Sequence, residues 1–227
     1  MYDITVVFFL WGEDWCDGNG FEYLEKLVRG IKKYSHQKIK FVCFCDDYNF
    51  NNFPVLDDVG FRKFDCPSWA GCLPKLKAYD ISNNFPTEQV FVFDLDTVVT
   101  GSLDSILGYR GEFCTRVWFG GLPAINLSGG DLVSFKRDMW EWIWEKFVAD
   151  TNKFLKLTRG GRERYVYRKL IKTQDFWQML FPNQYCSYKR HIERRNKIPS
   201  DTRLVSCHGD PRPHMLPKTS IIREYWK

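Results

Sequence analysis

Three apolar runs constrain the fold of this chain most: a helical segment separates the first two, and the second and third are followed directly by carboxylates. The runs Ile4–Leu10, Ile39–Cys45 and Gln89–Phe93 have the length and composition of buried strands. Between the first two, apolar residues recur at helical spacing over residues 21–31. Because strands that alternate with helices form mostly parallel sheets, the pattern predicts an α/β fold whose ligands bind at the carboxyl ends of the strands.

The rest of the chain predicts further elements of the same kind. Short helices are expected near residues 76–81 and 103–107, and strands near residues 113–118 and 124–127. Residues 131–149 carry an aromatic and aliphatic stripe, which predicts a longer helix packed on the core. With 227 residues and 44% hydrophobic content, the chain is expected to form a single domain over residues 1–227.

Charge and cysteine content narrow the class of protein. A formal net charge of +5 favours anionic ligands but is too small for a dedicated nucleic-acid binder, so no stable nucleic-acid complex is expected. The eight cysteines include no Cys-x-x-Cys pair and predict reduced thiols in a reducing, cytoplasmic compartment. The first apolar run is far too short to span a membrane, so no transmembrane segment is expected.

Two acids, Asp94 and Asp96, follow the third apolar run and predict a metal site. Alternate residues of an extended chain face the same side, so both carboxylates can meet at one point. Their charges repel unless a cation or a shared proton lies between them. Oxygen ligands suit Mg²⁺ or Mn²⁺, which complete their coordination with water and substrate phosphates. The alternative is that the pair only closes the strand and caps the next turn.

Polar residues elsewhere fit the same predicted site. Asp46 follows the second strand, where it either accepts a hydrogen bond from a base or ribose or belongs to a solvated turn. Near the end of the chain, His208 could add a nitrogen ligand for Mn²⁺, and Gly209 would let a phosphate approach the backbone. Arg212 lies between two prolines and has the forked donors that diphosphate oxygens accept.

Four segments in order resemble motifs of GT-A glycosyltransferases. Residues 93–104, 124–130, 174–175 and 208–214 are similar to successive motifs of the glycogenin-like family 8 group and its short bacterial and viral relatives. The resemblance implies a single-domain Rossmann-like GT-A fold, with a mostly parallel, mixed central sheet flanked by helices. It also implies a donor half over about residues 1–110 and an acceptor half over residues 111–227.

The activity implied by the resemblance is a metal-dependent hexosyl transfer. The donor would be a nucleoside-diphosphate sugar, with a UDP-sugar favoured, and the acceptor a hydroxyl of a glycan, lipid-linked glycan or protein. The cofactor would be Mn²⁺ or Mg²⁺, and retention of stereochemistry is favoured. By position in this sequence, the implied metal ligands are Asp94, Asp96 and His208. The implied donor-binding residues are Leu10, Trp11, Asp46, Lys75, Phe93, Asp94, Leu95, Ser128, Gly209 and Arg212, and the implied catalytic residues are Asn126, Gln174 and Asp175.

One position departs from the family pattern. An acid precedes the glutamine in the family, whereas Thr173 precedes Gln174 here. In relatives that acid contacts the donor sugar, so the choice of sugar is open at this point. Asp175 is our candidate for the catalytic base, with an acid at a helix N-terminus as its structural alternative.

Two basic segments have a role that the sequence leaves open. They either bind an anionic acceptor or membrane surface, or are solvated faces, and they cover residues 153–172 and 189–197.

Rival functions also remain open. A sugar-nucleotide-binding module without strong catalysis would explain why Thr173 stands where the family has an acid. A haloacid-dehalogenase-like phosphatase would use Asp94 as a nucleophile, but such enzymes place that acid on the first strand. A nucleic-acid-binding role would depend on the basic tract alone.

Overall fold

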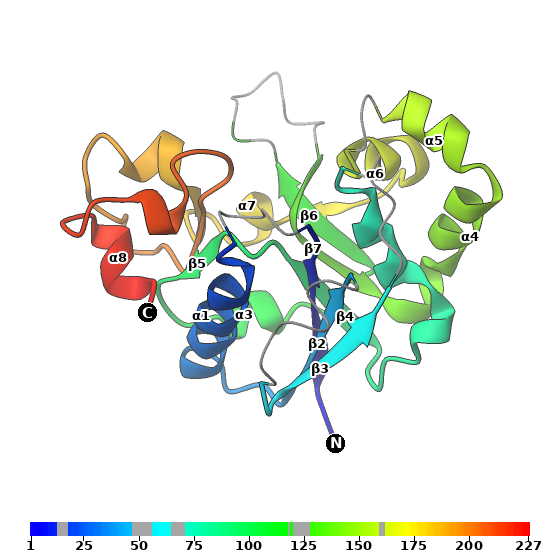
Figure 1. The fold of residues 1–227 in the computed structure, drawn as a ribbon, viewed down its shortest axis with the longest axis horizontal. Coiled ribbons are helices and arrows are strands. Elements are labelled where there is room, and N and C mark those ends of the chain that lie inside the picture. The colour runs from blue at the N-terminus through cyan, green and yellow to red at the C-terminus, as the bar shows by residue number, and fades with distance from the viewer. Residues whose placement is uncertain (13–17, 47–55, 65–70, 118, 120–127, 159–161) are drawn as a thin grey trace.

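A mixed seven-stranded sheet forms the centre of the molecule (Figure 1). The computed structural model describes residues 1–12, 18–46, 56–64, 71–117, 119, 128–158 and 162–227. The strand order is β3-β2-β1-β4-β7-β6-β8. The strands are β1 (Ile4–Leu10), β2 (Ile39–Cys45), β3 (Val59–Lys63), β4 (Gln89–Phe93), β6 (Phe113–Val117), β7 (Ser128–Lys136) and β8 (Asp175–Phe176).

Strand direction agrees with the predicted fold class. β3, β2, β1 and β4 are parallel, and β7 is antiparallel to both of its neighbours, β4 and β6. β8 returns to the parallel direction beside β6. The predicted α/β fold with a mostly parallel, mixed sheet is therefore confirmed, and the carboxyl ends of β1, β2 and β4 lie at one edge.

A second, three-stranded sheet attaches the C-terminal part of the chain to that edge. It has the order β5-β10-β9, formed by β5 (Thr97–Val99), β10 (Leu204–Ser206) and β9 (Tyr185–Ser187). β10 pairs antiparallel with β5, directly after the Asp94–Asp96 turn. The amide of Cys207 then donates to the carbonyl of Asp96 over 3.0 Å. The loop that carries His208 is thus joined to the acidic turn by backbone hydrogen bonds.

Helices cover both faces of the central sheet (Figure 1). The α-helices are α1 (Gly20–Lys33), α3 (Asp104–Leu107), α4 (Glu141–Ala149), α5 (Thr151–Leu157), α6 (Arg164–Leu170), α7 (Trp177–Leu180) and α8 (Ile221–Tyr225). The 3₁₀ turns are η1 (Leu73–Tyr79), η2 (Ile81–Asn83), η4 (Arg137–Met139) and η6 (Pro213–Met215), and η5 (Tyr188–Ile192) is a π turn.

Alternation of side chains along β1 divides the core into two clusters. Val6 and Phe8 pack with α1, α3, α7 and α8, whereas Val7 and Phe9 pack with η1 and α4–α6. Both faces of the strand are therefore buried, which explains why its sequence is apolar at every position. No described helix is long and apolar enough to cross a membrane. The six described cysteines are all free thiols.

The helix expected over residues 131–149 is wrong in its first half. Residues up to Lys136 belong to β7, and α4 begins only at Glu141. Leu132 packs in one core cluster while Val133 and Phe135 pack in the other, so the segment alternates as a strand does. A strand buried on both faces has a nearly continuous apolar sequence instead of an alternating one. Here that sequence lies only a few residues before the apolar stripe of α4, so the two together resemble one helix.

Other expectations differ less from the structure. The short helix expected near residues 76–81 is η1, which begins at Leu73 and ends at Tyr79, and α3 and β6 confirm the elements expected near residues 103–107 and 113–118. β3 was not expected, because its sequence carries glycine and two cations. The strand expected over residues 124–127 lies outside the described residues.

Candidate functional site

The Asp94–Asp96 turn links β4 to β5 at the carboxyl edge of the sheet. The amide of Asp94 donates to the carbonyl of Asp131 on β7 over 2.8 Å, and the amide of Thr97 donates to the carbonyl of Asp94 over 3.2 Å. Phe93 and Leu95 point into the core. The apolar side chains of the turn therefore face the core, whereas Asp94 pairs with Lys75 and Asp96 is influenced by Arg212.

Lys75 on η1 pairs with Asp94 and, over 3.4 Å, with Glu163. Burial alone would lower the pKa of Lys75, but Asp94 and Glu163 together raise it well above its usual value. Burial raises the pKa of Asp94 to about 7, against the lowering effect of Lys75. Asp96, Asp131 and Glu163 contribute to that rise. A buried ammonium thus lies between two carboxylates, and the donor contact predicted for Lys75 stays a prediction.

Asp96 is only 9% exposed, and its Oδ1 has no hydrogen-bond partner among the described residues. Burial raises the pKa of Asp96, and the nearby Arg212 guanidinium lowers it. An unpartnered buried carboxylate oxygen is costly unless a cation or donor satisfies it. This oxygen is the feature of the site that fits a divalent cation.

His208 lies on the same side but points toward other partners. Its Nε2 is 3.0 Å from Ser187 Oγ, and its ring stacks on Phe119 with centroids 5.9 Å apart. Burial lowers the pKa of His208. Among the described residues, no three histidine, cysteine or acidic side chains are close enough together to hold a metal ion. A metal ion held by Asp94, Asp96 and His208 therefore stays a prediction.

Asp131 on β7 is a buried acid that the sequence analysis did not single out. Its carboxylate pairs with Arg116 and accepts hydrogen bonds from Tyr185 over 2.9 Å and from Ser206 over 2.7 Å. Burial would raise its pKa, but these partners, Arg116 above all, lower it. The available signal was an acid within an apolar run, which the helix prediction placed at a helix start.

The residues predicted to surround the nucleotide base lie at the ends of β1 and β2. Leu10 is buried in the core, and Trp11 is half-buried with its ring 6.4 Å from that of Phe9. Asp46 accepts a hydrogen bond from the amide of Gly12 over 2.7 Å. The structure thus brings Asp46 to the end of β1, where its carboxylate connects the two strand ends.

The residues predicted near the donor sugar separate into two places. Ser128 Oγ lies 2.9 Å from Gln174 Oε1, so these two meet at the start of β7. Asp175 is exposed and accepts a hydrogen bond from the hydroxyl of Tyr109 over 2.7 Å. Thr173 is also exposed. Asn126 lies outside the described residues.

Gly209 has a backbone φ of +68°, in the left-handed region that favours glycine. It follows His208 and precedes the segment in which Arg212 approaches Asp96. The Nε of Arg212 lies 3.9 Å from the carboxylate of Asp210, and the predicted contacts of Gly209 and Arg212 with a diphosphate stay predictions.

The basic tract occupies α5 and α6. A pocket of about 440 Å³ is lined by Leu157, Tyr165, Arg168 and Lys169. The Arg168 guanidinium lies 5.6 Å from the centre of the Tyr165 ring. An aromatic ring flanked by cations suits an anionic ligand or a headgroup layer.

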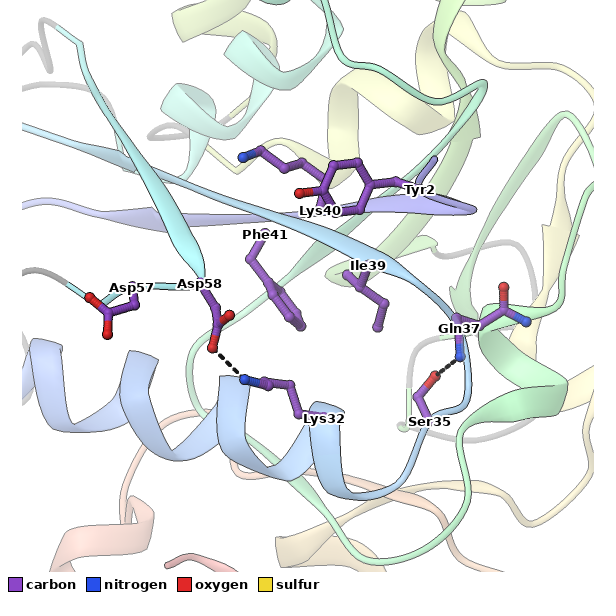
Figure 2. Close-up of a pocket in the computed structure, with 9 residues that line it drawn as sticks. All are labelled: Tyr2, Lys32, Ser35, Gln37, Ile39, Lys40, Phe41, Asp57 and Asp58. Carbon is purple, nitrogen blue, oxygen red and sulfur yellow. Dashed lines mark hydrogen bonds and ion pairs between the residues drawn. The ribbon is translucent and has the colours of Figure 1, made fainter.

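Another pocket, of about 320 Å³, lies at the opposite edge of the sheet. Figure 2 shows Ile39 and Phe41 pointing toward the side of β2 on which Lys32 pairs with Asp58, whereas Tyr2 lies on the other side of that strand. These residues lie at the amino ends of β1, β2 and β3 and at the end of α1. Ligands of parallel α/β sheets bind at the carboxyl ends, so we do not assign the candidate site to this pocket.

Comparisons with known proteins place the fold. No protein-family model and no curated protein matches the sequence. Among solved structures, the chain is similar to the glycosyltransferase GlyE of Streptococcus pneumoniae TIGR4, with a TM-score of 0.62 and 15% identity. It is similar to the bifunctional glycosyltransferase WbbM in its apo form, with a TM-score of 0.61 and 12% identity. It is also similar to the galactosyltransferase LgtC in complex with donor and acceptor sugar analogues, with a TM-score of 0.66 and 10% identity.

The coverage of these matches differs. The match spans 100% of this chain but 59% of GlyE, and 93% of this chain but 47% of WbbM. For LgtC it spans 98% of this chain and 93% of that one. The chain therefore has a GT-A-like glycosyltransferase fold, and it spans only about half of the length of GlyE and of WbbM.

Proposed function

We propose that this protein transfers a hexose from a nucleoside-diphosphate sugar, with a UDP-sugar favoured, to an acceptor hydroxyl in the presence of Mn²⁺ or Mg²⁺. The observation that carries the proposal is the acidic turn at the carboxyl end of β4, where Lys75 contacts Asp94 and Arg212 approaches Asp96. The GT-A-like fold supports it, because LgtC, a structure with that fold, is described with donor and acceptor sugar analogues.

Asp94 and Asp96 would hold the metal, and the unpartnered Oδ1 of Asp96 is the oxygen best placed to bind it. His208 would join them by giving up its contact with Ser187. When bound, the metal would offset negative charge on the diphosphate leaving group. Arg212 and Lys75 would stabilise the same charge from the protein, as preorganised cations do in a partly dry site.

The remaining predicted residues would bind the rest of the donor. Trp11 and Asp46 lie at the strand ends where a base or ribose would bind. Ser128, Gln174 and Asn126 are proposed to face the sugar, and Asp175 is the proposed base. The acceptor class is a glycan, lipid-linked glycan or protein, and the basic face of α5 and α6 suits an anionic one.

A sugar-nucleotide-binding module with weak catalysis is the second candidate. The specific observation that favours it is that Thr173 replaces the expected acid, while the neighbouring Asp175 is held by Tyr109. Such a module would bind the donor through the same acidic turn but would not break its glycosidic bond.

A thermal-shift screen of sugar nucleotides with and without Mn²⁺ tests the proposal. Ligand present at 100 times its Kd stabilises the folded state by about 2.7 kcal/mol, so binding is detectable before the acceptor is known. Stabilisation that needs Mn²⁺ and disappears in Asp96→Asn is expected. Asp57→Asn, at the opposite edge of the sheet, is the matched control and should keep the shift.

Turnover assays then separate the candidates. Slow Mn²⁺-dependent hydrolysis of a bound sugar nucleotide supports the transferase, and binding without any turnover supports the module. The absence of stabilisation by every sugar nucleotide would reject both. Hydrolysis of a phosphomonoester alone would instead support the phosphatase.

A further inference from the structure

Glu163 is an acid from the basic tract that reaches the candidate site. It precedes α6, and its backbone carbonyl accepts a hydrogen bond from the amide of Val166 over 2.8 Å. Its side chain turns away from solvent, with the residue only 5% exposed. The carboxylate lies 3.4 Å from Lys75 Nζ, on an element 88 residues earlier in the chain. The first turn of α6 thus fixes an acid against the donor edge of the sheet.

Lys75 is held between two carboxylates from different elements. Asp94 contacts the ammonium from the end of β4, and Glu163 contacts it from the start of α6. An ammonium as buried as this one needs paired charges, since its hydration is lost. Asp94 is also a proposed metal ligand, so Glu163 is the partner of Lys75 that the proposed metal site does not use.

The backbone of β7 holds Glu163 from the other side. The three nearest atoms that a Cβ on Gly130 would meet all belong to the Glu163 side chain, and the carboxylate oxygen would overlap it. An alanine at position 130 would therefore displace the Glu163 carboxylate from the place where it meets Lys75.

We propose that Glu163 is a positioning residue that keeps the Lys75 ammonium on Asp94, so that this charge pair meets the donor diphosphate and its metal already in place. The inference rests on the proposed function. A buried ion pair contributes little to stability compared with apolar residues of the same volume, which favours a role in orientation. An oriented cation avoids the cost of ordering when the diphosphate arrives.

A double-mutant cycle between positions 130 and 163 tests the inference. The probe is UDP with Mn²⁺, measured by calorimetry on the full chain. Gly130→Ala displaces the Glu163 carboxylate without changing any charge, and Glu163→Ala removes it. Each single change should weaken Mn²⁺-dependent UDP affinity by roughly 10- to 100-fold, the usual effect of losing a group that orients a metal ligand.

The double variant distinguishes contact from general damage. Without the Glu163 side chain, the added methyl group at position 130 meets none of the three atoms that it would otherwise meet. The double variant should therefore bind UDP no more weakly than Glu163→Ala alone. Additive losses, or UDP affinity unchanged in either single variant, would overturn the inference. Gly60→Ala on β3, where the nearest atom to the new Cβ is 3.6 Å away, is the matched control.

Glu163→Gln separates charge from shape. It keeps the side-chain volume and leaves Lys75 paired with Asp94, so it should lose UDP affinity with a smaller fall in the apo thermal midpoint than Glu163→Ala. Full UDP affinity in Glu163→Gln would overturn the inference, since an uncharged group would then hold Lys75 equally well. If the unaltered chain binds neither UDP nor any sugar nucleotide, the proposed function fails and this inference with it. If the unaltered chain binds and all Glu163 variants bind equally, only the inference fails.

Discussion

The carboxylate of Asp131 accepts a hydrogen bond from the hydroxyl of Tyr185 over 2.9 Å, which joins the central sheet to the three-stranded sheet. The same carboxylate accepts from Ser206 on β10 and pairs with Arg116 on β6. One buried acid therefore connects three strands from two sheets. Because its backbone carbonyl also binds the amide of Asp94, it fixes the acidic turn relative to the His208 loop.

Asp131→Ala should destabilise the protein strongly. Removing one partner of a buried ion pair leaves the other charge, Arg116, without compensation and costs about 3–5 kcal/mol. Urea denaturation followed by circular dichroism measures the loss. Asp138→Ala is the control, because its pair with Arg137 is exposed and should contribute about 1 kcal/mol or less. Equal losses in the two variants would contradict the role given to Asp131.

Asp96→Ala should abolish metal-dependent donor binding without destabilising the apo protein. The Oδ1 of Asp96 makes no hydrogen bond in the described part of the chain, and burial disfavours its charge, so its removal costs the fold little. Calorimetric titration with UDP and Mn²⁺ measures the first effect, and thermal unfolding measures the second. Unchanged affinity for UDP and Mn²⁺ would exclude Asp96 from the site.

His208→Ala should weaken Mn²⁺ binding more than it weakens folding. Its ring is half-buried, and its Nε2 lies 3.0 Å from the hydroxyl of Ser187. His191→Ala is a close control, because His191 binds the amide of the same serine and packs at 5.7 Å on the same Phe119 ring. If both variants lose equal thermal stability and both keep Mn²⁺ affinity, His208 is a structural histidine only.

Reversal of two charges on α6 should weaken binding to an anionic surface. Arg168→Glu with Lys169→Glu changes the pocket that Tyr165 lines, and each basic residue near an anionic membrane contributes about 1 kcal/mol. Sedimentation with vesicles containing phosphatidylserine should show at least about a 10-fold loss, and the unaltered chain should release at high salt. UDP binding should be unaffected. Vesicle binding that persists in the variant would assign these cations to a solvated face.

Local sequence predicted the parts of the fold that depend on burial. β1, β2, β4 and α1 were found because their apolar pattern reflects the faces they bury. The acidic turn was found because it follows one of these strands. The same signal failed at residues 131–136. A strand that is buried on both faces is as hydrophobic as the start of an aromatic helix, so the apolar pattern did not distinguish the two.

Pairings between distant elements could not be predicted in this way. Glu163 meets Lys75 where Tyr167 of α6 packs on Tyr79 of η1, and no spacing along the chain encodes that contact. The partners of Asp131 depend likewise on how two sheets join. The resemblance to a family indicated which segments meet, namely the acidic turn and the His208 loop, but not that the His208 ring would lie against Ser187 and Phe119.

The central place of β10 in the three-stranded sheet has a kinetic consequence. Val205 is paired on both sides, with Val98 and with Cys186, so its backbone is exposed to solvent only when this sheet opens. Asp96 directly precedes β5, and Arg212 follows β10. A ligand that bridges these two residues would therefore have to dissociate before β5 and β10 could separate. Amide hydrogen exchange at Val205 should therefore slow in proportion to ligand occupancy, which makes this strand an internal reporter of binding.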